Sequence, residues 1–423
     1  MTYRQESISQ APGFVRIVCS LAFILVCIFL IVLSLRFGIS RALSRVGVSS
    51  KAIAVANEAA RLAPLDPDAH RAKALVFREL GMFQNAKDEM EIAASLRPRD
   101  DYLWLEVGEL RDELGDPVGA LAAFDQAVAF APYYAHTRWQ RANLRLRMGR
   151  YDEAFPEMRE AAKSNRTYMP TLIDLAWSLS KHDVRVTEQL AGIDSVADRT
   201  ALARLLAKQG KGRETLQQYA FIKSNVSAEI RRELVDALIA NFNYAEAFQI
   251  WSDQDGSAEQ PSQIHDGGFE GALSFGETGF GWRMIRQPQI TISQDVSEKD
   301  SGEKSLLLEF TGTSPATSAS VSQLIIVKPD HTYLLSFAVR SSDIATGGAP
   351  ILLVEDARSQ KRIHTTDLQL EPGIWHKVSI EFRTTPDCFA VLLKVVRNEC
   401  QGSPCPIFGR LWLDSFGIEE SKR

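Results

Sequence analysis

Glycine, alanine and proline recur in this sequence at a fixed interval of 34 residues. Four classes of position keep the interval: Gly81, Gly115 and Gly149; Ala86, Ala120 and Ala154; Ala93, Ala127 and Ala161; and Pro98 and Pro132. A period of this length is typical of stacked helix pairs, in which each pair buries its apolar face only against its neighbours. Such stacks usually present binding surfaces, so the period favours binding over catalysis.

The residues between these landmarks predict two helices in each unit. Over residues 68–80 apolar side chains recur at helical spacing, and Gly81 follows where a helix end needs a left-handed residue. A second helix is expected over about 84–96, and Pro98 ends it. The alanines of the period lie two turns apart on this second helix, which lets the paired helix approach closely.

One unit, residues 101–134, resembles the tetratricopeptide repeat. The matching positions are Trp104, Val107, Gly108, Gly115, Ala120, Phe124, Ala127 and Pro132. Units 67–100 and 135–168 match less completely, and Arg166 stands where the third unit should carry proline. The resemblance implies a solenoid of helix pairs.

The period also extends in both directions from these units. One step back from the glycine, alanine and proline positions finds Gly47, Ala52, Ala59 and Pro64. The opening helix of that unit would occupy about residues 33–46, so repeats are expected over 36–168. Residues 169–252 lose the spacing and are expected to form degenerate repeats, with an irregular stretch at 180–198.

In the tetratricopeptide family the first helix of each pair lines a concave groove, which implies that this chain binds a protein partner there. The family's groove positions correspond to four residues in each unit: Asp68, Arg71, Leu75 and Arg78; Tyr102, Leu105, Glu109 and Asp112; and His136, Trp139, Asn143 and Leu146. Both charge signs and aromatic rings are present, without the Lys/Asn set that clamps a terminal carboxylate in some members. The expected ligand is therefore a protein segment. The alternative is that several of these residues make only intramolecular contacts.

Residues 17–35 form a stretch of 19 residues without a charge. As a helix, at about 1.5 Å per residue, it would be roughly 28 Å long, about the thickness of a bilayer's hydrocarbon core. We therefore expect a single transmembrane helix at 17–35 after a tail at 1–16. The alternative is a cleaved signal peptide, which needs a shorter apolar core and a small-residue cleavage site, whereas Arg36 and Phe37 follow here.

The orientation of this helix is open from the basic residues alone. The N-terminal side carries Arg4 and Arg16, and the C-terminal side carries Arg36, Arg41, Arg45 and Lys51. The positive-inside rule would leave the large body in the cytoplasm. A disulfide between Cys400 and Cys405, which bracket a Pro/Gly-containing loop, would need an oxidising compartment. The alternative to the disulfide is two unpaired thiols in a surface loop. We favour a periplasmic or extracytoplasmic body over a cytoplasmic one.

The composition changes at residue 253, where a polar linker over 253–266 precedes short alternating runs. The runs cover residues 305–310, 320–327, 333–339, 351–354, 375–382, 389–396 and 411–416. Short alternating runs separated by turn residues predict an all-β sandwich over 267–420. The expected fold is multidomain: a transmembrane helix, an all-α helical-repeat solenoid and an all-β jelly roll.

Six segments of this region resemble the carbohydrate-binding, galactose-binding-like jelly roll. They are GGFE (267–270), GFGW (279–282), GEKSL (302–306), YLLSFAVR (333–340), IWHKVSIEF (374–382) and LWLDSF (411–416). The resemblance implies one structural calcium ion on Glu270 and Asp414; the alternative is that both carboxylates cap strand ends or pair with Lys or Arg. It also implies a glycan site. Its candidates are Trp282, Arg286, Tyr333 and Trp375, and the alternative for each is a place in the sandwich core.

The sequence offers no motif for catalysis or nucleic-acid binding. It contains no glycine-rich phosphate loop, no HExxH and no GxSxG, and its seven histidines are scattered. A net charge of −5 without a basic stripe argues against nucleic acid. We therefore expect no enzyme and no cofactor beyond the calcium ion.

The order of modules resembles bacterial envelope proteins that accompany polysaccharide synthesis or export. It implies a membrane-anchored adaptor whose repeats hold a protein and whose sandwich touches polysaccharide. Two alternatives stay open at this point. One is a purely structural scaffold without sugar binding, and the other is a degenerate envelope enzyme.

Overall fold

The computed structural model describes residues 13–253, 260–276, 279–313, 319–368, 370–398, 400 and 405–421. Most of the expected tail, residues 1–12, and part of the expected linker, residues 254–259, lie outside these ranges. The chain divides into two compact units, Met1–Gly192 and Ile193–Arg423. The division falls inside the stretch expected to hold degenerate repeats.

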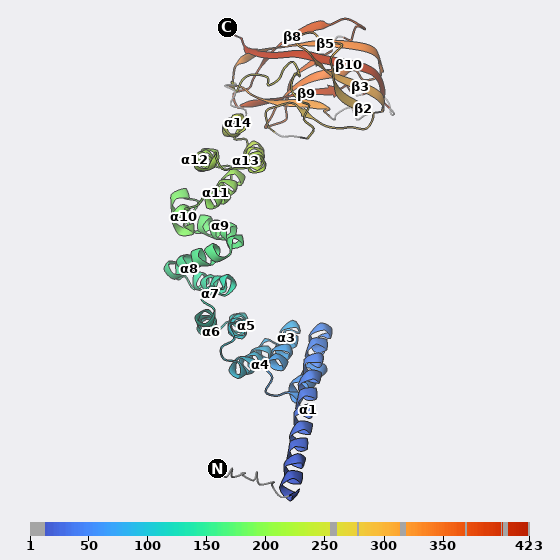
Figure 1. Cartoon of the computed structure of the whole chain (residues 1–423). Helices are drawn as coiled ribbons and strands as arrows, with labels where there is room; N and C mark the ends of the chain where they lie inside the picture. Colours follow the sequence, from blue (N-terminus) through green and yellow to red (C-terminus); the bar gives the residue numbers. More distant parts are fainter. Residues whose placement is uncertain are drawn as a thin grey trace, which may run out of the picture. The chain divides into compact units, whose positions relative to one another are not determined.

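The first unit is a succession of packed helix pairs (Figure 1). Its helices are α1 (Gly13–Ser50), α2 (Ile53–Leu62), α3 (Pro67–Glu79), α4 (Phe83–Leu96), α5 (Asp101–Glu113), α6 (Pro117–Phe130), α7 (Ala135–Arg147), α8 (Tyr151–Ser164), the short 3-10 helix η1 (Arg166–Tyr168), α9 (Met169–Leu179) and α10 (Val184–Ala191). The helices expected at 68–80 and 84–96 are confirmed as α3 and α4.

The periodic residues have the roles that their chemistry requires. Gly81, Gly115 and Gly149 follow helices with φ of +74°, +76° and +76°, the left-handed region that glycine occupies without strain. The alanines at the two periodic positions of α4, α6 and α8 are all 0% exposed, so each marks a close helix contact. Side-chain caps from Asp66 and Asp100 begin α3 and α5.

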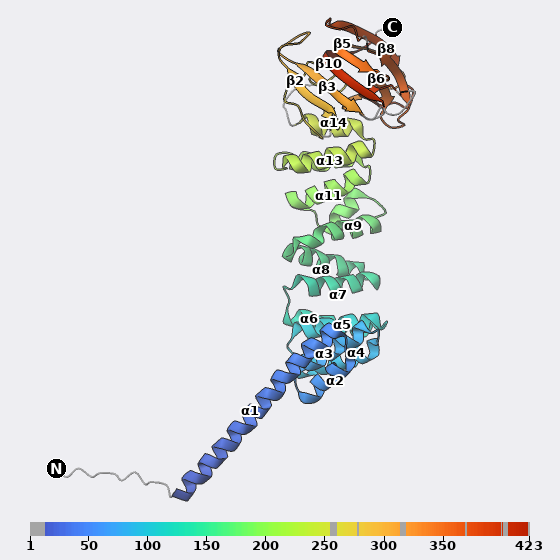
Figure 2. The same ribbon diagram turned by 90° about the vertical axis from the view of Figure 1, so that its right-hand side faces the viewer.

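Helix α1 continues without a break from the apolar segment into the first repeat (Figure 2). The Ser40 hydroxyl donates to the Ala59 carbonyl at 2.8 Å, and a Cβ on Gly47 would lie 3.2 Å from the Ala56 backbone nitrogen. These contacts fix α1 to α2, and α1 extends to Ser50. Among the described residues it is the one helix long and apolar enough to cross a membrane, a test that a signal sequence also passes.

The second unit begins with two more helix pairs and ends in a β-sandwich. The helices are α11 (Val196–Lys208), α12 (Gly212–Ile222), α13 (Ala228–Ala240) and α14 (Tyr244–Ser252). Between α13 and α14, Phe242 has a φ of +61° at the turn position that Gly210 occupies, with φ of +68°, between α11 and α12. The short α10 and the turn after it form the irregular stretch expected at 180–198.

The sandwich consists of two five-stranded antiparallel sheets, ordered β1-β4-β9-β6-β7 and β2-β3-β10-β5-β8. The strands are β1 (Arg283–Met284), β2 (Ile290–Asp295), β3 (Ser305–Thr313), β4 (Val321–Ile326), β5 (Thr332–Thr346), β6 (Pro350–Asp356), β7 (Arg362–Asp367), β8 (His376–Arg383), β9 (Ala390–Arg397) and β10 (Pro406–Glu420). All seven expected runs are strands. The sequence reading missed β1, β2 and β7, which lie at sheet edges and carry few alternating apolar residues.

Helices of the second unit cover part of the outer face of the first sheet. Leu324 and Ile326 of β4 pack with Phe248 and Trp251 of α14 in one apolar cluster. Gly279 has a φ of +124°, and a Cβ there would lie 2.7 Å from the Trp251 ring. Glycine is therefore required where the indole lies against the loop before β1.

Candidate functional site

The expected groove residues lie on α3, α5 and α7, and their charged members bind one another. The Arg71 guanidinium donates to both Glu106 carboxylate oxygens, at 2.6 and 2.9 Å, and lies 4.9 Å from the Tyr102 ring centre. Glu106 has a side chain only 6% exposed. Truncating Arg71 would leave that carboxylate buried without its partner, which usually costs several kcal/mol.

A second set of ion pairs joins consecutive repeats at nearly the period of the sequence. Arg78 of α3 pairs with Glu109, at 3.1 Å, and with Glu113 of α5. Asp112 of α5 in turn pairs with Arg147 of α7 at 2.5 Å. For Arg71, Arg78 and Glu109 the structure thus shows intramolecular contacts, the alternative considered from the sequence.

Leu105 corrects the sequence-based groove. It is only 1% exposed and belongs to an apolar cluster with Phe124 and Leu144. A leucine at this position is short enough for the next helix pair to cover it completely. Leu75 and Asn143 are half-buried.

Two of the expected aromatic groove residues contact a third aromatic residue, Tyr168, that was not predicted from the sequence. The Trp139 ring stacks on the Tyr168 ring with centroids 4.6 Å apart, and His136 Nδ1 lies 3.2 Å from the Tyr168 hydroxyl. Tyr134 approaches His136 edge-on. Tyr168 stands one period after Tyr134, and that spacing was the signal that could have revealed it.

A pocket of about 490 Å³ opens between α1 and α3. Its lining residues are Arg41, Ser44, Arg45, Val48, Ser49, Asp68, Arg71, Ala72 and Leu75. Arg41 and Ser44 stand one period before Leu75 and Arg78, so α1 provides the groove face of a repeat preceding α3. The pocket is the N-terminal end of the expected groove.

Two of the four expected glycan contacts are wrong because their rings lie in the sandwich core. Trp282 is 7% exposed, packs against Phe269 and Phe416, and donates from its indole nitrogen to the Asp266 carbonyl at 2.9 Å. Tyr333 is 1% exposed, and its hydroxyl accepts a hydrogen bond from the Lys328 amide.

The other two glycan candidates are accessible but separate. Arg286 is exposed, with its guanidinium 4.6 Å from the Phe275 ring centre, and it follows β1 at the edge of one sheet. Trp375 is half-buried and precedes β8 at the edge of the other sheet. These residues do not form one binding platform.

Glu270 and Asp414 lie close together, as the calcium prediction requires. Glu270 Oε1 accepts hydrogen bonds from the Glu303 and Lys304 amides, and Asp414 Oδ2 accepts from those of Asp300 and Ser301. Burial raises the pKa of Asp414. The loop between β2 and β3 thus directs backbone N–H groups at both carboxylates, whereas Ca²⁺ would need oxygen ligands there. The described residues contain no group of three or more potential metal-binding side chains of His, Cys, Asp or Glu, and calcium stays a prediction.

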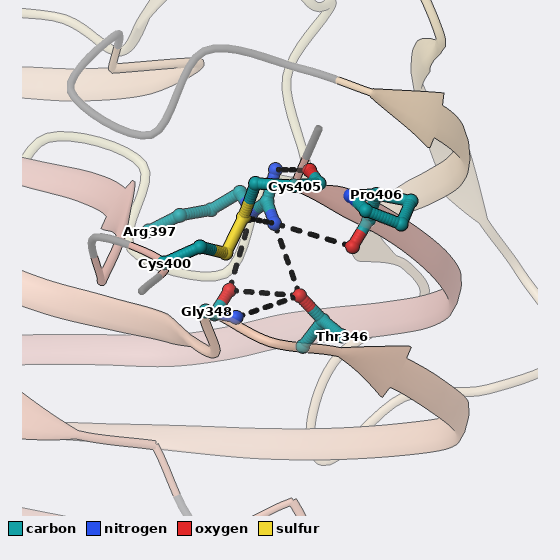
Figure 3. The surroundings of a disulfide bond; sticks show 6 residues. All are labelled: Thr346, Gly348, Arg397, Cys400, Cys405 and Pro406. Atoms are coloured by element: carbon teal, nitrogen blue, oxygen red, sulfur yellow. Dashed lines mark hydrogen bonds between the residues drawn. A yellow bond between two sulfur atoms is a disulfide. The ribbon is translucent and has the colours of Figure 1, made fainter. Parts of the chain in front are cut away.

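Cys400 and Cys405 are joined by a disulfide beside a buried arginine (Figure 3). Arg397 is 6% exposed and donates to the Cys405 carbonyl at 3.2 Å and to the Gly348 carbonyl at 3.2 Å. Burial lowers the pKa of this guanidinium. Arg397 therefore links Cys405 to the turn between β5 and β6.

A further cavity of about 380 Å³ lies within the second unit, between its last two helices and the outer face of the first sheet. Phe242 and Tyr244 contribute aromatic rings, and Arg283, Ser322 and Gln360 contribute polar groups. Arg358 lies 5.2 Å from the Phe242 ring centre.

No protein-family model matches this chain, and no curated protein matches it. MamA 41-end from Desulfovibrio magneticus RS-1 is similar over 39% of this chain and 98% of its own, with 20% identity and a TM-score of 0.32. YrrB, a TPR protein with an unusual peptide-binding site, is similar over 51% and 90%, with 17% identity and a TM-score of 0.29.

The CBM22-1 xylan-binding domain of Paenibacillus barcinonensis Xyn10C is similar over 40% of this chain and 99% of its own, with 15% identity and a TM-score of 0.28. Similarities at these TM-scores establish no function. The fold described above rests on the helices and the two sheets themselves.

Proposed function

We propose that this chain is a non-enzymatic scaffold, held at a membrane by α1, whose repeats bind a segment of a protein partner. The observation that carries the proposal is the continuity of α1. One helix contains both the apolar segment and the groove face of the first repeat. A flexible tether would leave the repeats free to reorient, whereas this helix holds them at a set height.

The exposed rings along the repeats support a protein ligand. Tyr102, Tyr133 and Tyr134 are 45%, 84% and 47% exposed, which is unusual for such large side chains. Tyrosine is enriched at protein interfaces because its ring gives contact area and its hydroxyl gives a hydrogen bond. The charged groove positions, by contrast, already bind each other and contribute less to a partner.

The membrane and compartment parts of the proposal are tested together. We propose an extracytoplasmic body, supported by the Cys400–Cys405 disulfide, and a role beside polysaccharide synthesis or export in a bacterial envelope. Alkaline phosphatase fused after Arg423 should be active, and the chain should stay with membranes after a carbonate wash. A fluorescent cytoplasmic reporter at the same position, or release by carbonate, would contradict the proposal.

Glycan binding by the sandwich is the second candidate function. The cavity beside Phe242 and Tyr244 favours it, because sugar sites combine aromatic faces with polar groups. A purely structural role is better supported, since Trp282 and Tyr333 are core residues and α14 covers part of one sheet. If the full chain binds to a glycan array and Phe242→Ala abolishes this binding, glycan binding is supported. If the full chain does not bind to the array, the purely structural role is supported.

A further inference from the structure

The pocket between α1 and α3 contains one cation without an ion pair and one buried hydroxyl without a hydrogen-bond partner among the described residues. Arg41 and Arg71 are compensated: Arg41 lies 3.5 Å from Asp66, and Arg71 binds Glu106. Arg45 is exposed and forms no ion pair within the described part of the chain.

The unpartnered hydroxyl belongs to Ser44, which is 7% exposed. Its Oγ has no hydrogen-bond partner among the described residues, although it lines the pocket. Buried hydroxyls are nearly always hydrogen-bonded, so this one points to an acceptor that comes from outside the unit. A carboxylate beside Arg45 would supply the acceptor and neutralise the cation.

The other polar groups of the pocket have partners: Asp68 lies 3.7 Å from Arg41 and 3.3 Å from Arg97, and the Ser49 hydroxyl donates to the Val46 carbonyl. The remaining lining is apolar. Val48, Ala72 and Leu75 face the same space, and Val48 is 37% exposed. Apolar surface beside a single unpaired cation suits a ligand that carries one acidic group next to one apolar group.

The distance of the pocket from the bilayer indicates which kind of molecule supplies that ligand. Arg45 lies ten residues beyond Leu35, the end of the apolar segment, which is about 15 Å along a helix. The polar layer of a bilayer is only about 5–8 Å thick on each side, so lipid headgroups end below Arg45. A polypeptide that leaves the bilayer beside α1 reaches the pocket without displacing the helix.

We propose that this pocket binds the membrane-proximal segment of an integral membrane partner, through an Asp or Glu that lies next to an apolar residue. The inference rests on the proposed function, in that α1 anchors the chain and the repeats bind protein. It adds the class of partner and the residues that recognise it.

The test places a photoreactive benzoylphenylalanine at Val48 of the full chain in native membranes. The expected adduct is a peptide with an acidic residue within about 20 residues of a transmembrane span. Arg45→Glu should lower the adduct yield about tenfold or more, as expected for the loss of a charge-assisted hydrogen bond. Arg61→Glu is the control for a charge reversal outside the pocket and should leave the yield unchanged, because Arg61 is an exposed residue of α2 that pairs with Glu58.

Two further measurements separate recognition from folding. Ser44→Ala removes the unpartnered hydroxyl, so it should lower the yield several-fold while the melting temperature stays the same or rises. Replacing the partner's acidic residue by lysine should restore the yield in the Arg45→Glu chain.

An adduct with lipid only, with a soluble protein, or no adduct at all would overturn the inference if the chain stays in the membrane fraction. If adducts form from Tyr134 but not from Val48, the proposed function stands and this inference fails. Loss of the chain from the membrane fraction would instead overturn the anchor, and the inference with it.

Discussion

The contact between Gly108 and Phe124 offers a sharp test of how the repeats pack. Gly108 lies inside α5, and a Cβ there would lie 2.5 Å from two ring carbons of Phe124 on α6 and 3.0 Å from a third. Phe124 is 2% exposed and belongs to an apolar cluster with Leu105 and Leu144, so other side chains surround its ring. Gly108→Ala therefore has two opposing effects on stability: it raises the helix propensity of α5 and it overpacks the contact with α6.

The two effects can be compared in magnitude. Alanine in place of glycine favours a helix interior by about 1 kcal/mol. Overpacking a closed core costs about 1–3 kcal/mol, and three overlapping carbons place this site toward the upper end. We expect a net loss of about 2 kcal/mol, which lowers the melting temperature by about 2–4 °C for each kcal/mol in a unit of this size.

The assay is thermal unfolding of the full chain in detergent by circular dichroism, with hydrogen exchange of the α5 and α6 amides as the local readout. Phe124→Leu combined with Gly108→Ala should lose less than the sum of the single changes. Gly38→Ala is the control, because no heavy atom lies within 4 Å of a Cβ there. An unchanged or higher melting temperature for Gly108→Ala would refute the reasoning.

Three further predictions follow from single contacts. A hydrogen bond to Glu89, at 2.7 Å, raises the pKa of His70 despite burial. The stability that this bond contributes is therefore complete below about pH 6.5, and it is lost as the pH rises through the raised pKa of His70 in the folded state. The free energy of unfolding, measured in urea, should therefore differ less between the natural chain and His70→Gln as the pH rises over that range. Phe242→Gly should raise the melting temperature of the second unit. Relief of the left-handed backbone gains about 1–2 kcal/mol, which exceeds the loss of an exposed cation–π contact of about 0.5–1 kcal/mol. A lower melting temperature would show that the ring stabilises the fold. Amide N–H groups already bind Glu270 and Asp414, so the same transition should be unchanged by calcium chelation if these bonds alone hold the two carboxylates; a lower melting temperature on chelation would instead support the predicted calcium ion.

Local patterns in the sequence determined most of the architecture. The 34-residue period set the helix pairs because each landmark has a local cause: a left-handed turn at Gly81, or a close helix contact at Ala86. The apolar run and the period that continues through Gly47 were enough to predict that α1 enters the first repeat. The alternating runs gave seven strands, since a half-buried strand exposes every second residue to solvent.

Only the tertiary structure decided which of these residues face a ligand. Leu105 and Trp139 hold equivalent positions one period apart, yet one is 1% exposed and the other stacks on Tyr168 at the surface of the repeat. Trp282 and Trp375 are both aromatic residues next to strands, and only Trp282 lies in the core. Periodicity fixes the face of an element on which a side chain lies, but burial depends on which distant segment covers that face. That choice is made by contacts between residues far apart in the chain.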